Sequence, residues 1–578
     1  MAEAISPTTT EVPKSDAVSA NKPSGVPVEI PPLSGLPLVI VTFALSMAVF
    51  MMVLDSTIAN VALPTIAGDL GAATSQGTWV ITMFAVSNAI SIPLTGWLAR
   101  QFGSVKVFLW SATLFVVCSW LCGISHSLPM LIAARMAQGA VAGPMIPLSQ
   151  ALLLQAFPAQ KRAMALGLFA MVVVTAPILG PILGGYLVDN YHWGWIFFIN
   201  IPIGIVSILL AWQQLKDRET PVLKTKVDVI GLTLLVVGVG ALQFFLDRGK
   251  ELDWFASPEI IVLATVSVLA LSYLVIWERG EKHPIIDLSL FADRNFTIGT
   301  VVISLAFLIY MGAIVLLPVM LQQTMGYTAV WAGLAAAPIG IFPVLLTPII
   351  GKYARNIDMR ILVTLSFLVY CGTFIWRSEF NPQMTFWDVF WPQFMQGLGT
   401  AMFFMPLTTI ALSNVPIHKM ASATGLFTFV RTLAGGIGAS LVMTVWDRRA
   451  VMHHAQLTES LTTGSNAATW LAQLEASGMS HEQALVLINQ NINQQALIIP
   501  EKNAVNDMGT FGNFSYLFQD DSDWEEGLKE DEWIVDNIDW LSQCFIDNDI
   551  PLEEIFFRWF YQAVNCSDWR CSACGGCI

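Results

Sequence analysis

Thirteen apolar runs, each long enough to cross a bilayer, constrain this chain more than any other feature. A helix needs about 20 apolar residues to span the hydrocarbon core, and in lipid only helices and closed barrels satisfy their backbone polar groups. The sequence therefore predicts an all-α integral membrane protein. The runs cover approximately residues 36–63, 78–98, 105–125, 129–152, 162–188, 195–214, 228–246, 258–277, 297–318, 330–350, 360–376, 386–411 and 421–446.

The charge of the chain is unevenly distributed. Only 12% of the 578 residues are charged, about half the fraction of a soluble domain. From Pro500 to Ile578 there are 17 acidic and 4 basic residues, whereas the rest of the chain has 25 and 24. The acidic balance excludes a nucleic-acid partner, and the composition indicates a nearly neutral membrane protein with an acidic C-terminal segment.

Basic residues in the loops predict the topology. With the N-terminus in the cytoplasm, inner loops contain 15 Lys and Arg and outer loops 5, in agreement with the positive-inside rule. Gly96-Trp97-Leu98-Ala99-Arg100 after the second run recurs as Gly351-Lys352-Tyr353-Ala354-Arg355 after the tenth. Such a repeat predicts two similar bundles separated by an inserted helix pair.

These observations divide the chain into six regions. We expect a disordered cytoplasmic tail, an N-terminal six-helix bundle, an insertion with helices 7 and 8, a C-terminal bundle with helices 9–13, an outer polar segment and the acidic tail. Their boundaries are 1–35, 36–214, 215–295, 296–446, 447–499 and 500–578.

Ionisable residues within the apolar runs are the best candidates for function, because each is costly in lipid unless it is paired or faces a cavity. Asp55 lies near the end of the first run and suits a group that takes up and releases a proton; the alternative is hydration at the outer interface. Arg135 lies early in the fourth run, one turn from Gln138, and either joins a buried polar network or extends to the interface. Asn60 and Arg431 are secondary candidates.

The fifth run contains two prolines and three glycines: Pro177, Gly180, Pro181, Gly184 and Gly185. Prolines remove backbone donors and bend a helix, and glycines allow a second helix to approach closely. The pattern predicts a kinked packing helix.

Three of these segments resemble motifs of drug:proton antiporters in the major facilitator superfamily. The run from Asp55 to Pro64 resembles the first-helix motif, the Arg135–Gln138–Gly139 helix resembles motif B, and the Gly-Pro helix resembles the antiporter motif C. Thirteen helices with an extra central pair resemble the fourteen-helix branch, over about residues 36–498, with the last helix missing. The segment from Tyr191 to Gly204 is also similar to a multidrug exporter of this branch.

The resemblance implies a major facilitator fold of two six-helix bundles around a central cavity. It implies proton-driven export of hydrophobic compounds across the bacterial inner membrane, with a periplasmic membrane-fusion adaptor and an outer-membrane channel as partners. Asp55 would couple protons and Arg135 with Gln138 would relay them, while the bend at Gly180, Pro181, Gly184 and Gly185 would seal against leak. No cofactor, metal or enzyme activity is implied. After the second run the family's usual Asp is absent, since Arg100 and Gln101 stand there, which puts a charge relay by this loop in doubt.

The acidic tail allows several interpretations. Cys566, Cys571, Cys574 and Cys577 have a spacing that suits zinc or an iron–sulfur cluster, but no histidine supports it and an oxidising compartment favours disulfides. We prefer the hypothesis that the tail replaces helix 14 through a frame change, a fusion or an error in the coding region. A non-transporting membrane sensor or adaptor that acts through the tail is the alternative function.

Overall fold

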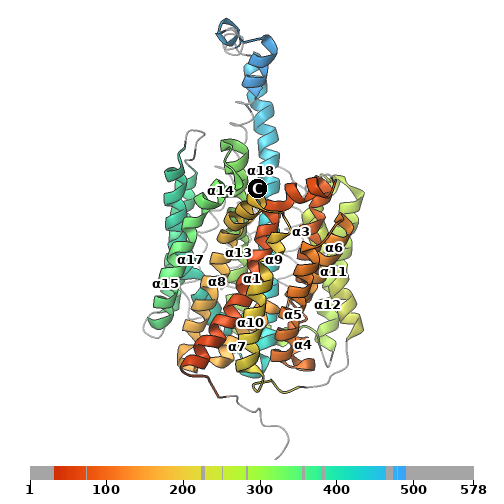
Figure 1. The fold of residues 1–578 in the computed structure, drawn as a ribbon, viewed down its shortest axis with the longest axis vertical. Helices are drawn as coiled ribbons and strands as arrows, with labels where there is room; N and C mark the ends of the chain where they lie inside the picture. The colour runs from red at the N-terminus through yellow and green to blue at the C-terminus, as the bar shows by residue number, and fades with distance from the viewer. Residues whose placement is uncertain are drawn as a thin grey trace, which may run out of the picture.

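Helices make up all the regular structure that the computed structural model of this chain describes (Figure 1). The described residues are 31–72, 74–222, 228–249, 252–281, 284–353, 358–378, 380, 384–463, 471, 473–477, 479–489 and 492. The acidic tail and its cysteines lie outside them. The all-α prediction is confirmed.

The helices follow the apolar runs in order. The N-terminal bundle contains α1 (Leu36–Asp69), α3 (Trp79–Ser91), α4 (Thr95–Phe102), α5 (Ser104–Gly123), α6 (Leu128–Ala142), α7 (Met145–Ala156), α8 (Arg162–Asn190), α9 (Trp195–Phe198) and α10 (Asn200–Leu215). The inserted pair is α11 (Val229–Gly249) and α12 (Pro258–Gly280). The C-terminal bundle contains α13 (Arg294–Met325), α14 (Ala329–Ala336), α15 (Ile341–Tyr353), α16 (Met359–Arg377), α17 (Phe386–Leu412) and α18 (Met420–Thr463).

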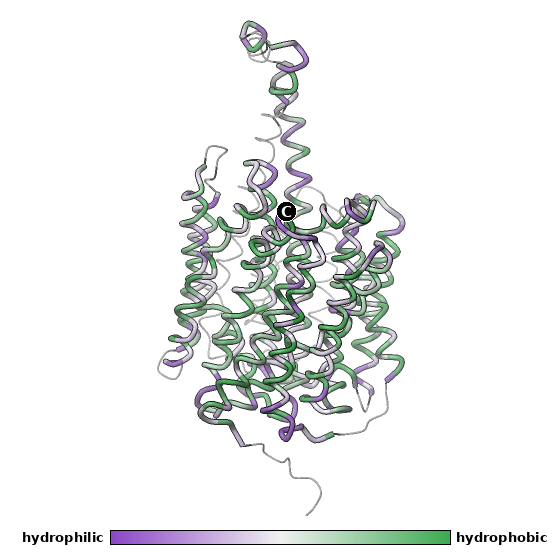
Figure 2. Tube along the Cα trace, viewed as in Figure 1, coloured by the Kyte–Doolittle hydropathy of each residue, from purple (hydrophilic) through white to green (hydrophobic). Residues whose placement is uncertain are grey.

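The number of membrane spans agrees with the sequence. Twelve segments of the described chain are long and apolar enough to cross a membrane, and α3 with α4 forms a thirteenth that bends by 59°. The last of these spans is Ile417–Ala455, so the described residues contain no fourteenth span. In Figure 1, α18 continues well beyond the other helices, and Figure 2 shows that this extension is more hydrophilic than the bundles.

The two repeat glycines lie where one bundle contacts the other. A Cβ on Gly96, in α4, would lie 2.5 Å from the Ser422 hydroxyl oxygen of α18. A Cβ on Gly351, in α15, would lie 2.8 Å from the Met164 Cα of α8. Only glycine permits such close approach of helices. The repeated motif therefore provides corresponding contacts in the two bundles.

The inserted pair packs beside both bundles. α11 contacts α12 and α3, and the Ser440 hydroxyl of α18 donates a 2.9 Å hydrogen bond to the Leu246 carbonyl of α11. α12 exposes large apolar side chains, among them Val268, Leu269 and Ile276. Such a surface is typical of a helix that contacts lipid or another protein, so α12 lies on the outside of the helical bundle.

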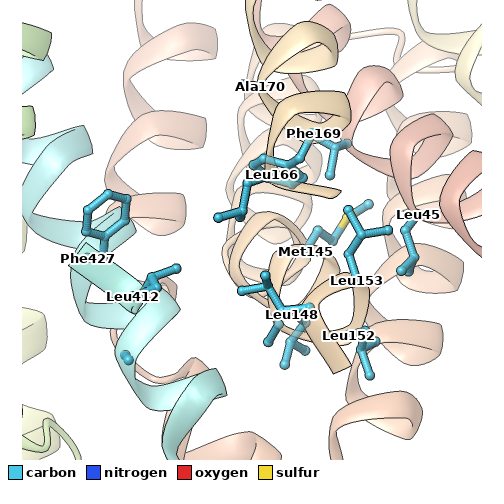
Figure 3. Close-up of a cluster of buried hydrophobic side chains, with 14 of the residues drawn as sticks. Leu45, Met145, Leu148, Leu152, Leu153, Leu166, Phe169, Ala170, Leu412 and Phe427 are labelled. Atoms are coloured by element: carbon cyan, nitrogen blue, oxygen red, sulfur yellow. The ribbon is translucent and has the colours of Figure 1, made fainter. Parts of the chain in front are cut away.

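One apolar core joins the bundles. Figure 3 shows Leu148 and Leu153 of α7 and Leu166 of α8 opposite Leu412 of α17 and Phe427 of α18, and all belong to the same buried cluster. Burial of this shared surface favours the packed arrangement of the two halves.

Candidate functional site

Asp55 and Arg135 form an ion pair inside the N-terminal bundle. The Arg135 Nη1 atom donates to Asp55 Oδ2 at 2.6 Å, and both side chains are at most 1% exposed. A charged side chain at such depth requires a partner of opposite charge, and Asp55 and Arg135 are each other's partner. Asp55 is therefore not hydrated at an interface, and Arg135 does not extend to one.

Amide side chains complete the coordination of the carboxylate. Gln138 accepts from Arg135 Nη1 at 2.8 Å and donates to Asp55 Oδ1 at 3.2 Å. Asn200, the first residue of α10, donates to the same oxygen at 2.6 Å and to the Ser119 hydroxyl at 3.0 Å. Four helices thus contribute to one buried network, which we call the Asp55 network: Asp55, Ser119, Arg135, Gln138 and Asn200.

Aromatic rings enclose the guanidinium of the pair. Arg135 Cζ lies 4.1 Å from the ring centre of Phe84 and 5.5 Å from that of Phe197. Its Nε donates to the Val80 carbonyl at 3.3 Å. Cation–π contacts strengthen when water is excluded, so the two rings add to the interactions that hold the guanidinium in place.

The glycines of the fifth run pack α8 against α1 beside this network. A Cβ on Gly180 would lie 2.1 Å from Thr57 Oγ1, and one on Gly184 would lie 2.8 Å from Ile58 Cγ1. On the opposite side, a Cβ on Gly185 would lie 2.5 Å from Val330 of α14, in the other bundle. α8 thus contacts both the helix of Asp55 and the C-terminal bundle.

The prolines of this run do not break the helix. α8 is continuous from Arg162 to Asn190 and includes Pro177 and Pro181 within its helical turns. The glycine contacts agree with the packing part of the prediction, whereas sealing against leak stays a prediction.

The structure does not bring the two secondary candidates to the network. Asn60 lies further along α1 and is exposed. Arg431 is 4% exposed and lies in α18 of the other bundle, 5.2 Å from the ring centre of Phe307 and 5.8 Å from that of Phe427.

Arg100, in the segment after the second run, contacts the other bundle; whether this segment relays charge stays a question for experiment. Arg100 at the end of α4 donates to Ser422 Oγ of α18 and to the Pro284 carbonyl, both at 2.9 Å. One side chain thereby connects the N-terminal bundle, the C-terminal bundle and the loop that follows the inserted pair. We call this contact the Arg100 clamp.

A second ion pair holds the loop that follows the inserted pair. Lys419 lies 3.0 Å from Asp287, which precedes the short helix η3 (Leu288–Ala292). Although partial burial raises the pKa of Asp287, hydrogen bonds from Ser289 and Lys419 outweigh it and hold this pKa below its ordinary value. The carboxylate therefore stays charged down to acidic pH.

Glu219 places a carboxylate beside the segment that follows the second run. Its two oxygens accept 3.0 Å hydrogen bonds from the backbone N–H groups of Val105 and Lys106, at the start of α5. A negative charge at a helix N-terminus is stabilising. Sequence reasoning missed this residue because it lies more than a hundred positions further along the chain.

The carboxyl group of Asp55 could take up and release a proton within this network. Protonation of Asp55 would remove the charge that pairs with Arg135, and an arginine cannot release a proton in compensation. The described residues contain no group of three His, Cys, Asp or Glu placed to hold a metal ion. The network therefore combines a single titratable carboxyl group with a fixed positive charge.

Comparison with known proteins identifies the family to which this chain belongs. The family model for the Major Facilitator Superfamily matches residues 45–439. The multidrug export protein EmrB of Escherichia coli K12 is 59% identical over 470 residues, which cover 81% of this chain and 92% of EmrB. The fatty acid resistance protein FarB of Neisseria gonorrhoeae is 56% identical over 473 residues, 82% of this chain and 93% of FarB. A second family model, described as PM0253, matches residues 485–567.

Solved structures share the fold at low sequence identity. The crystal structure of the human organic anion transporter MFSD10 (TETRAN) aligns with a TM-score of 0.51 at 15% identity, over 71% of this chain and 94% of that one. An inward-facing, occupied bacterial homologue of the human lysosomal transporter Spinster aligns with a TM-score of 0.50 at 15% identity, over 84% and 97%. With twelve candidate spans in the described residues, or thirteen when the bent pair is included, the matching family model and relatives of more than 50% identity, the chain belongs to the Major Facilitator Superfamily of membrane transporters.

Proposed function

We propose that this protein exports hydrophobic drugs and toxic compounds across the bacterial inner membrane, in exchange for protons that move inward. The observation that carries the proposal is the buried pair of Asp55 with Arg135, at 2.6 Å. A carboxyl group that alternates between a paired and a protonated state is the minimum that proton coupling requires.

The names of the relatives support the substrate class. EmrB is a multidrug export protein, and FarB confers fatty acid resistance. Both align over more than 90% of their own length. The shared feature of such compounds is a large apolar body, and a bilayer concentrates them beside the bundles.

Movement of α1 would link the proton to the bundles. When Asp55 takes up a proton, its attraction to Arg135 falls and α1 can shift relative to α6. Thr57 lies two residues further along α1, against Gly180 of α8, so a shift of α1 displaces α8. Since α8 also contacts the C-terminal bundle at Val330, the two halves rock about the central site.

The orientation and the partners belong to the same proposal. The excess of basic residues in alternate loops supports a cytoplasmic N-terminus, and the long extension of α18 would then project into the periplasm. A membrane-fusion adaptor and an outer-membrane channel would receive the exported compound there, as in the tripartite systems that the family resemblance implies.

Efflux from proteoliposomes with an imposed pH gradient tests the proposal. Asp55→Asn should abolish gradient-driven efflux of a fluorescent hydrophobic compound, because the amide cannot take up the proton. Asp69→Asn is the matched control, since Asp69 ends the same helix with a largely exposed side chain. Full gradient-driven efflux by Asp55→Asn would refute proton coupling through this residue, and no efflux by the unmodified protein would refute export.

A further inference from the structure

Glu278, near the end of α12, is a buried carboxyl group that the proposed export mechanism does not use. It is 4% exposed, and neither of its carboxylate oxygens has a hydrogen-bond partner in the described structure. The backbone N–H groups of Ile285 and Ile286 approach it, but neither donates with hydrogen-bond geometry. Since an ionised carboxylate is costly to bury without donors, this environment favours the neutral, protonated form.

A second carboxylate, that of Asp228, lies at the same place. Asp228 precedes α11, and Gly231 lies in the first turn of that helix. A Cβ on Gly231 would overlap with Asp228 Oδ2 and would lie 2.9 Å from Glu278 Oε1. Both carboxylates therefore face one point at the end of the inserted pair, where only a glycine leaves room for them. Two carboxylates that share a site do not readily ionise together.

The hydrogen-bond donors at this site all go to Asp228. Its Oδ1 accepts from the Gly231 backbone N–H at 3.0 Å, and the Trp277 Nε1 atom donates to both of its oxygens, at 3.0 and 3.1 Å. Asp228 is therefore suited to be the ionised member of the pair and Glu278 the protonated one, because unequal environments separate the proton affinities of two neighbouring carboxyl groups. A protonated carboxyl group also has a hydrogen that it can donate, and Asp228 is the acceptor beside it.

Other charged groups of the described chain also act on this site. Glu281, three residues further along α12, adds to the negative charge around Glu278. Arg100 of α4 is a cation within electrostatic reach of Glu278, but its guanidinium donates to the two acceptors of the Arg100 clamp and not to this carboxylate. Asp287, which also acts on Arg100, is already paired with Lys419.

We propose that Glu278 is a proton-binding residue separate from Asp55, and that it holds a proton against the Asp228 carboxylate beside the Arg100 clamp. This inference goes beyond the proposed function, which assigns proton binding to Asp55. The ligand is a proton and not a metal ion, because the described residues contain no group of three His, Cys, Asp or Glu placed to hold a metal. Release of the proton leaves a negative charge that competes for Arg100 with the acceptors of the clamp. The contact between the two bundles therefore depends on whether Glu278 is protonated.

Infrared spectroscopy of the full chain in lipid nanodiscs tests the site directly, because a protonated carboxyl group has a carbonyl stretching band that an ionised one lacks. Glu278→Gln should remove one such band at neutral pH, whereas Glu259→Gln, at the exposed start of the same helix, should keep it. Asp228→Asn removes the neighbouring negative charge, so more of Glu278 should be ionised at neutral pH and the band should weaken. An unchanged set of bands in Glu278→Gln would overturn the proposal, and so would loss of the band when sodium replaces choline at constant pH.

Stability separates proton binding from a purely structural role of Glu278. The amide of Glu278→Gln resembles a protonated carboxyl group, so the variant should keep the thermal stability of the unmodified protein at neutral pH. A clear loss would mean that an ionised carboxylate holds the neighbouring loop, and it would overturn the proposal.

Spin-label distances test the connection to the Arg100 clamp. Distances between α4 and α18 should change from neutral to alkaline pH in the unmodified protein and stay constant in Glu278→Gln. The same pH dependence in both proteins would overturn the connection. None of these measurements requires transport, and the infrared band of Glu278 should persist in Asp55→Asn, so failure of the export proposal would leave this site standing.

Discussion

A double-mutant cycle on Asp55 and Arg135 tests how the buried pair is stabilised. In Asp55→Asn, an amide replaces a carboxylate that accepts from Arg135, Gln138 and Asn200. A hydrogen bond to a charged group contributes about 1.5–3 kcal/mol, and a donor forced against another donor costs a further 1–3 kcal/mol. We therefore expect Asp55→Asn to lower the free energy of unfolding by about 3–5 kcal/mol, the usual cost of breaking a buried ion pair.

The reciprocal change should cost less. In Arg135→Met, Asp55 keeps its hydrogen bonds from Gln138 and Asn200, and it can become neutral by taking up a proton, which Arg135 cannot do. We expect a loss of about 1–3 kcal/mol from the broken charged hydrogen bond. The double variant leaves no unpaired charge, so its loss should fall short of the sum of the single losses by about 2–3 kcal/mol.

Unfolding in mixed detergent micelles, followed by circular dichroism, measures these differences. Asp69→Asn on the exposed end of α1 controls for the loss of a carboxylate as such. If the sum of the two single losses equals the loss in the double variant to within about 0.5 kcal/mol, the reasoning is refuted, because the two side chains would then contribute independently to stability. An Arg135→Met protein less stable than Asp55→Asn would contradict the asymmetry.

Three further outcomes are expected. Asn200→Ala should lower gradient-driven efflux and cost about 1–3 kcal/mol of stability, because Asp55 loses its 2.6 Å donor; unaltered efflux would exclude Asn200 from the mechanism. Gly184→Val should displace α8 from α1 and reduce the amount of folded protein, whereas Gly436→Val should not, since space is open there; equal yields would contradict the packing argument. Arg100→Met should weaken the contact between α4 and α18, and spin-label distances across this contact should broaden; an unchanged distribution would show that the clamp does not hold the bundles together.

The apolar runs predicted the spans well because the bilayer imposes one length and one composition on each of them. The second run was harder, because it crosses the membrane as two helices, α3 and α4, that meet at a 59° bend. Pro93 lies in the break between them, and proline cannot continue a helix without losing a backbone hydrogen bond. Run length alone carries no information on such a bend.

Three members of the Asp55 network could be predicted from the sequence, and two could not. Asp55, Arg135 and Gln138 stand out in apolar sequence, and the structure brings all three together. Asn200 and Ser119 do not stand out, since neutral polar residues are common near helix ends and inside apolar helices. Their membership depends on contacts across 145 and 81 positions of the chain, which one sequence does not encode in any local pattern.

The origin of the acidic tail stays a hypothesis. A family model matches residues 485–567 and so begins before the composition changes at Pro500. This match does not distinguish among a frame change, a fusion and an error in the coding region. Intact-mass measurement of the protein from its native gene tests the hypothesis, because finding the C-terminus as written would refute a replaced helix 14.

The position of α11 has a mechanical consequence. It packs against α3 of one bundle and is hydrogen-bonded to α18 of the other, so it bridges the two bundles on one side. If the two halves tilt in opposite directions, as the proposed export mechanism requires, α11 cannot keep both contacts. Under that proposal, each cycle would break and remake one of them, and the strength of the α11 contacts would influence the rate of the cycle.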